Sequence, residues 1–235
     1  MRRRQFTRAA AACSLGPLLA LTYLQAQALS LGQITEGEAS AGLKAALESG
    51  ALSAIGLLGK TDGFLGNAKV RIPLPGFLED AGKLMKKLGQ GKRIDELVTS
   101  MNRAAETAVP LAKNLLVGAV KSMSVTDAKQ ILTGGDTSVT QFFAEKTRTP
   151  LSGTFLPVVT KATEKVGLAQ KYNDVAGKAS SMGLLKKEDA NIQQYVTGKS
   201  LDGLYYMIGE EEKKLRQNPL GSSSAILKKV FGSLK

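Results

Sequence analysis

Four polar side chains within residues 95–123 are the first candidates for chemistry in this sequence. They stand among alanines and leucines and are Asn102, Arg103, Glu106 and Lys113. On a helix Arg103 lies one turn before Glu106, and Pro110 removes the backbone hydrogen bond to the Glu106 carbonyl. These residues could form a metal-independent hydrolytic site in which the arginine tunes the carboxylate. Alternatively they form a polar face that makes hydrogen bonds between helices, and we favour this structural interpretation.

Two predicted helix starts carry capping residues, and one of them could bind an anion. Ser124 and Asp127 have the spacing of a capping box, with Asp in place of the usual Glu. The second start comprises Gly134, Gly135, Asp136 and Thr137. Its free backbone N–H groups could hold an anion. Capping by Asp136 explains the same residues without a ligand, and we favour that explanation.

Composition excludes several classes of chemistry. The sequence has no histidine, and its one cysteine is Cys13. Ordinary zinc, copper and haem sites need imidazole or thiolate ligands, and serine or cysteine triads need a histidine base. We therefore expect no metal, no cofactor and no catalytic residue of these classes.

Hydrophobic periodicity predicts an all-α protein with one bundle-like domain over residues 41–235. Through residues 95–123 apolar side chains recur at a helical period on one side only, which indicates the central helix. Residues 60–76 contain closely spaced glycines and prolines, which exclude a helix there. We expect this stretch to be an extended loop that packs across the helices.

Glycine and proline mark the expected ends of the other helices. We expect one break near Gly50 and another near Gly198, because glycine lowers helix stability. Pro110 should kink the central helix, and Pro150 and Pro157 should bracket or kink one further element. A last short helix is expected to begin near residue 222.

The first 28 residues have the order of a secretory signal peptide. A leader with four arginines precedes an apolar Ala/Leu stretch, and a small-x-small cleavage site ends at Ala28. Arg3 and Arg4 resemble a twin-arginine export signal, which we favour over the general secretory route. The apolar run is broken by Pro17 and is too short for a spanning helix. We therefore expect a periplasmic protein with a flexible segment at 29–40 and no transmembrane segment in the mature chain.

Net charge bears on possible partners. Four of the 32 basic residues and none of the 20 acidic residues lie in residues 1–28, so the charge falls from +12 to about +8 after cleavage. Such a protein could meet anionic lipid headgroups or polyanions, although lysine-rich solvated faces are the simpler explanation. We expect no nucleic acid partner.

Several segments, taken in order, resemble one family. The longest are MNRAAETAVPLAK at 101–113, DAKQILTGGD at 127–136 and YVTGKSLDGLYYMIGEEEKKLRQNP at 195–219. They are similar to the exported bacterial proteins of domain-of-unknown-function family 4197. This resemblance implies an exported, mostly helical and often lipid-anchored protein, but this chain lacks a cysteine suited to lipid attachment. It implies no catalytic residues.

Three functions remain in order of preference. The first is non-catalytic binding of a protein or another envelope component. The second is the carriage of an apolar ligand such as a lipid, because small residues at 104–112 and 176–179 could leave room inside the bundle. The third is hydrolysis by Glu106 with Arg103.

Overall fold

The protein is an assembly of α-helices, seen in a computed structural model that describes residues 36–76, 78–79, 83, 86–183 and 190–217. Within these residues no strand occurs, which confirms the all-α prediction. The α-helices are α2 (Glu36–Leu58), α4 (Gly91–Ala108), α5 (Lys113–Lys121), α6 (Val125–Thr133), α7 (Ser138–Thr163), α8 (Gly167–Ser181) and α9 (Ile192–Gln217). A π-helical turn (Lys86–Gln90) precedes α4, and a 3-10 turn (Val109–Ala112) joins α4 to α5. The predicted signal peptide and the predicted last helix lie outside the described residues.

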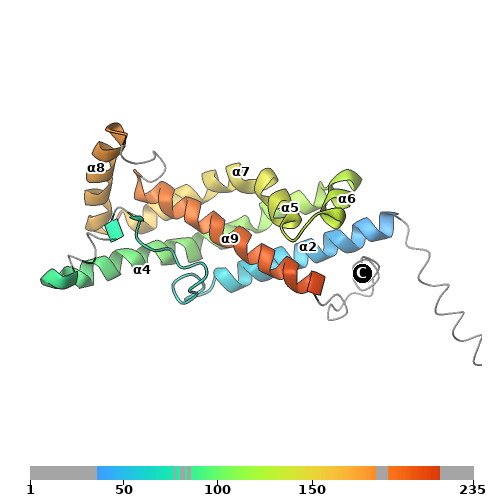
Figure 1. The fold of residues 1–235 in the computed structure, drawn as a ribbon, viewed down its shortest axis with the longest axis horizontal. Helices are drawn as coiled ribbons and strands as arrows, with labels where there is room; N and C mark the ends of the chain where they lie inside the picture. The colour runs from blue at the N-terminus through green and yellow to red at the C-terminus, as the bar shows by residue number, and fades with distance from the viewer. Residues whose placement is uncertain (1–35, 77, 80–82, 84–85, 184–189, 218–235) are drawn as a thin grey trace, which may run out of the picture.

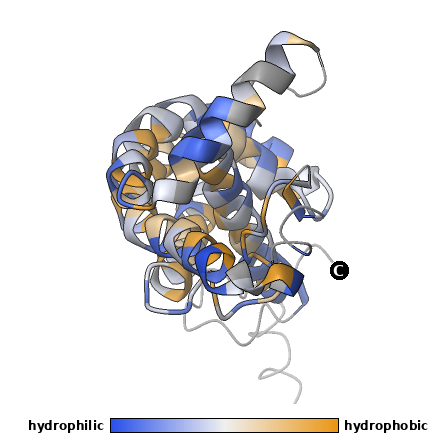
Figure 2. Cartoon of the chain, turned by 90° about the vertical axis from the view of Figure 1, so that its left-hand side faces the viewer, coloured by the Kyte–Doolittle hydropathy of each residue, from blue (hydrophilic) through white to orange (hydrophobic). Residues whose placement is uncertain are grey.

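The long helices lie roughly side by side along one axis (Figure 1). α9 packs mainly on α7 and α2, and α7 also packs on α4. α8 lies across one end of this bundle, while α5 and α6 lie toward the other end (Figure 1). The view along the long axis shows hydrophobic residues on the helix sides that face one another (Figure 2).

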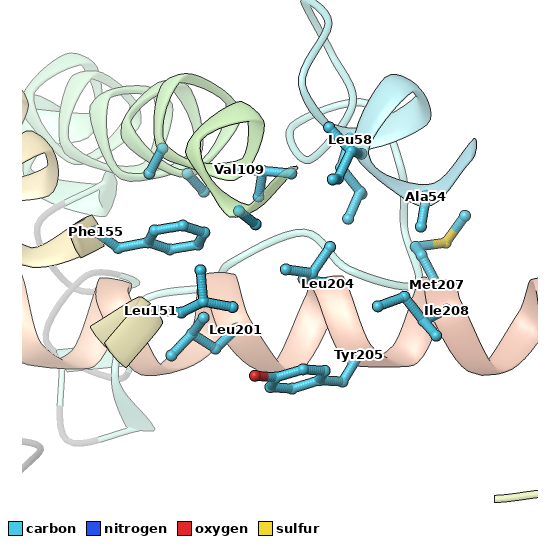
Figure 3. Packing of buried hydrophobic residues seen from close by; sticks show 14 of the residues in the cluster. Ala54, Leu58, Val109, Leu151, Phe155, Leu201, Leu204, Tyr205, Met207 and Ile208 are labelled. Carbon is cyan, nitrogen blue, oxygen red and sulfur yellow. The ribbon is translucent and has the colours of Figure 1, made fainter. Parts of the chain in front are cut away.

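The core is continuous and is filled by large side chains. Phe143 and Phe155 of α7 are fully buried, as are Leu58 of α2 and Leu97 of α4. Figure 3 shows Leu204 of α9 between these helices, close to Leu58 and Val109. Burying a side chain of this size stabilises the fold by about 1.5–3 kcal/mol. This one hydrophobic cluster therefore joins described residues that are more than a hundred positions apart.

Helix α2 is continuous, so the predicted break near Gly50 is wrong. The residues before and after the glycine, Leu47 and Ala51, are buried in the core. Their burial outweighs the cost of about 1 kcal/mol that glycine imposes on a helix. By length and composition α2 could cross a membrane over Ser40–Leu58, but its packing on α5 and α9 also accounts for its apolar character.

The predicted break at Gly198 is wrong for the same reason. α9 runs without interruption from Ile192 to Gln217, and Val196 and Leu201 on either side of the glycine are buried. Pro150 and Pro157 likewise lie inside the single helix α7 rather than at its ends. Tertiary packing supplies the stability that these residues remove locally.

At Pro110 a 3-10 turn interrupts the α-helix, whereas the predicted kink stays a prediction. The backbone stays helical, with Ala112 and Lys113 both in right-handed conformations.

Ser124 and Asp127 form the predicted capping box at the start of α6, because the Ser124 side chain accepts from the Asp127 N–H at 3.0 Å and the carboxylate accepts from the Ser124 N–H at 2.9 Å.

Two glycines of α9 provide a matched pair for a stability prediction. A Cβ at Gly203 would lie 2.7 Å from Cε1 of Phe64, whose ring is fully buried, whereas a Cβ at Gly198 would meet nothing within 4 Å. We expect Gly203→Ala to destabilise the protein by about 1–3 kcal/mol through overpacking. Gly198→Ala should stabilise it by about 0.5–1 kcal/mol through helix propensity. Urea unfolding measures the free energy of unfolding of both variants. Equal changes in the two variants would contradict close packing at Gly203.

Candidate functional site

Glu106 is a buried carboxylate that holds the loop 59–76 against α4. It is 5% exposed, and its Oε1 accepts hydrogen bonds from the backbone N–H groups of Phe64 at 3.0 Å and Leu65 at 3.1 Å. Its Oε2 accepts from Nη1 of Arg103 at 2.6 Å. Both carboxylate oxygens are therefore engaged by donors of the protein itself.

Arg103 joins this carboxylate to the surface. Its Nη2 donates to Oδ1 of Asp62 at 2.8 Å, while Nη1 binds Glu106. The hydrogen bonds to Glu106 and then to Asp62 raise the pKa of the Arg103 guanidinium above its ordinary value. The arginine is thus fixed between two acids, one of which belongs to the loop.

Asn102 holds the next part of the same loop from the same helix. Its side chain is fully buried, and its Oδ1 accepts from the Ile72 N–H at 2.8 Å. Its Nδ2 donates to the Ile72 carbonyl at 2.9 Å and to the Val98 carbonyl at 2.8 Å. Tyr195 adds a hydrogen bond from its hydroxyl to the Pro73 carbonyl at 3.2 Å.

The loop is anchored against the helices, with Phe64 and Ile72 in the core, but residues 61–66 and 68–70 are turns, so the loop is not extended throughout. Residues 71–75 carry no regular secondary structure, and Asn102 takes the backbone N–H and carbonyl groups of Ile72. The polar face makes structural hydrogen bonds, but to a loop rather than between helices. Lys113 does not take part, since it is exposed on α5 beyond the 3-10 turn.

The predicted anion site surrounds a cleft of about 400 Å³ between α6 and α7. Gly134, Gly135 and Thr137 line it, but so do the carboxylates of Asp127 and Glu145. Two carboxylates oppose the binding of an anion at this place. The anion site stays a prediction without electrostatic support.

The capping assignment at the same place is wrong. The N-cap residue of α7 is Thr137 rather than Asp136, and its side chain makes no capping hydrogen bond. Ser138 instead donates to the Ile131 carbonyl at 3.0 Å, which ties the start of α7 to α6. The tertiary contact shifts the helix start by one residue.

Sequence reasoning missed a second buried acid, Glu212 of α9. It is 5% exposed, and its Oε1 accepts from Nε of Arg216 at 3.0 Å and from the Val139 N–H at 3.4 Å. Its Oε2 is buried without a hydrogen-bond partner among the described residues. Only the packing of α9 on α7 shows that this glutamate is internal.

Glu212 should lower the free energy of unfolding as pH rises, which is the opposite of what a carboxylate with a lowered pKa does. Burial raises the pKa of this carboxyl above its ordinary 4.5, against the opposing effect of Arg216. Because the folded state then binds the proton more tightly than the unfolded state, its contribution to stability is greatest below pH 4.5 and falls as pH rises toward the folded pKa. Urea unfolding across pH 4–7 should show a smaller fall for Glu212→Gln than for the unmodified protein.

Glu210 is the control for this measurement. The ion pairs with Lys69 and Lys213 lower the pKa of the Glu210 carboxyl, so its contribution is present above its ordinary pKa and is lost as pH falls. Glu210→Gln should therefore change the free energy of unfolding in a different way: the variant should lack the loss of stability that Glu210 causes as pH falls below its ordinary pKa. The same effect from both variants would contradict the burial of Glu212.

A basic cleft of about 540 Å³ lies between α4 and α8 and was also missed. Its lining residues are Arg93 and Glu96 of α4 with Lys165, Val166, Gly167 and Lys171 around the start of α8. The two helices meet there although their cleft residues are about seventy positions apart in the sequence. The sequence shows these cations only as scattered charges, because no run of like charges marks them.

These features define a class: an all-helical protein with a loop anchored on its central helix and, among its described residues, no cluster of potential metal ligands. The chain belongs to the family described as "Protein of unknown function (DUF4197)", whose model matches residues 33–232. The resemblance found in the sequence is thereby confirmed. No curated protein and no solved structure matches the chain.

Proposed function

We propose that this protein acts outside the cytoplasmic membrane by binding an envelope component, without chemistry of its own. One observation carries the proposal: the carboxylate best placed for catalysis, Glu106, has both oxygens occupied by hydrogen bonds that hold the loop. A general base needs a free lone pair directed at its substrate. Oε2 keeps one lone pair, but Glu106 is 5% exposed beneath the loop and Arg103, so a substrate could reach it only if one of them moved.

The alternative of an enclosed lipid has little room. The alanines at 104, 105, 108 and 112 are fully buried, so the small residues bring helices close together instead of leaving space. The apolar cavity between α2 and α9 has a volume of about 10 Å³. That is about the space that one water molecule needs, far less than an acyl chain.

Copurification tests the proposed function. The protein is isolated from the periplasm of its own host, and native mass spectrometry identifies whatever stays bound. We expect a surface-bound protein or envelope component. A lipid retained in stoichiometric amount inside the bundle would favour a carrier instead. A hydrolytic activity that disappears in folded Glu106→Gln protein would favour the enzyme.

The proposed location has its own test. Arg3 and Arg4 are required together if the leader is a twin-arginine signal. We expect the double replacement of these arginines by lysine to keep the precursor in the cytoplasm, as measured by cell fractionation. Arg8→Lys conserves charge outside the pair and should export normally. Normal export of the double variant would contradict twin-arginine export.

A further inference from the structure

We propose that the basic cleft between α4 and α8 binds a phosphate group of the ligand; this identification rests on the proposed function of binding without chemistry. The ligand class is a phosphate ester, either a lipid headgroup or a soluble phosphorylated molecule. Three cationic side chains line the cleft, and they are Arg93, Lys165 and Lys171. Glu96 is the acidic residue in the same lining.

What distinguishes the cations of the cleft is that three of them line one concavity and none of the three has an internal counterion among the described residues. Around α9, by contrast, cations are paired with acids: Lys214 of α9 with Glu211, and Arg148 of α7 with Asp202 of α9. Within the part of the chain that the structure describes, Arg93, Lys165 and Lys171 form no ion pair, not even with Glu96.

Unpaired cations around one concavity repel one another and create a positive potential in it. An anion that enters relieves this repulsion, and the exposed side chains can turn toward it without a change in the fold. Gly167, the first residue of α8, also lines the cleft, so the partial positive charge of the helix start adds to the potential, although it is small beside that of three side chains.

The dimensions favour a phosphate ester over a small inorganic ion. A volume of about 540 Å³ lies in the range of sites for small organic molecules. A phosphate group carries up to two negative charges and several acceptor oxygens, which suits guanidinium and ammonium donors approaching from two helices. Glu96 can accept a hydrogen bond from hydroxyl groups of the attached alcohol.

Two binding assays with the mature, lipid-free protein test this site. The first measures cosedimentation with phosphatidylcholine vesicles that do or do not contain phosphatidylglycerol. The second follows the Gly167 amide by NMR during titration with glycerol 3-phosphate. Binding to anionic vesicles alone assigns a membrane headgroup, and a saturable NMR shift assigns a soluble phosphate ester. Binding in neither assay overturns the proposal.

A charge-matched pair of triple variants locates the binding. One variant replaces Arg93, Lys165 and Lys171 by glutamine, and the other replaces Lys60, Lys113 and Lys121, which are exposed and outside the cleft. Two of these control lysines belong to α5, toward the opposite end of the molecule from α8 (Figure 1). All six side chains are exposed, so circular dichroism should show unchanged folds.

We expect the cleft variant to bind roughly tenfold more weakly or worse, and the control variant to lose much less. Equal losses would show that net charge alone drives binding and would overturn the site. If the cleft variant still copurifies with the same partner, the proposed function stands without this cleft. If nothing copurifies with the unmodified protein, the proposed function itself fails, whatever the vesicles show.

Discussion

Glu106→Ala is expected to destabilise the protein by about 3–5 kcal/mol, the cost of removing one partner from a buried charge network. The substitution leaves the N–H groups of Phe64 and Leu65 without an acceptor and leaves Arg103 without its inner partner. Because the loop then loses its buried carboxylate anchor on α4, the Phe64 ring should also pack less tightly. Equilibrium urea unfolding measures the loss.

Two further variants separate the buried contacts from surface charge. Asp62→Asn weakens only the exposed end of the Arg103 bridge and should cost less than about 1 kcal/mol. Glu106→Gln retains an acceptor for the two amides, so its loss in free energy of unfolding should lie between those of Glu106→Ala and Asp62→Asn. A loss below about 1 kcal/mol for Glu106→Ala would mean that the loop is held by its apolar side chains alone.

Asn102→Ala is the second substitution with a large expected effect, a loss of about 2–4 kcal/mol. It removes three hydrogen bonds and leaves the N–H and carbonyl of Ile72 buried without partners. Each unsatisfied buried group costs about 1–3 kcal/mol. Besides unfolding, hydrogen exchange of the Ile72 amide reports the effect directly, and its protection should fall.

Asn114→Ala is the control for this prediction. Asn114 lies exposed on α5, so its replacement should change stability by no more than about 0.5 kcal/mol. Asn102→Asp is a sharper probe, because it conserves the shape and the acceptor but loses both donated hydrogen bonds. If the Asp variant matches the unmodified protein at neutral pH, the contacts to the Ile72 and Val98 carbonyls contribute little.

Local pattern alone was sufficient for several features of this protein. The amphipathic period predicts the central helix, and Pro110 predicts its distortion, because a missing N–H acts within one turn. The spacing of Ser124 and Asp127 predicts a cap that involves only neighbouring residues. The lack of histidine excludes imidazole chemistry whatever the fold. The helix, its distortion and the cap depend on interactions between residues a few positions apart, and the last exclusion depends on composition alone.

Helix continuity was decided by tertiary packing. Gly50 and Gly198 each reduce local helix stability, yet both lie inside long helices whose neighbouring side chains are buried. The cost of about 1 kcal/mol in helix stability follows from the residue type alone. The burial that outweighs it depends on which helices pack together. The prolines Pro150 and Pro157 also lower local helix stability, and they too lie inside one continuous helix, α7.

The roles of the polar residues were likewise decided by the fold. The sequence shows that Asn102, Arg103 and Glu106 share one helix, and so it singles them out. Whether they face solvent, a substrate or another part of the chain depends on the loop at 59–76, some thirty to forty positions away. The structure directs them at backbone groups of that loop, because a buried loop must have its N–H and carbonyl groups satisfied. The cleft between α4 and α8 is a tertiary feature for the same physical reason: its charges become neighbours only when the two helices pack together.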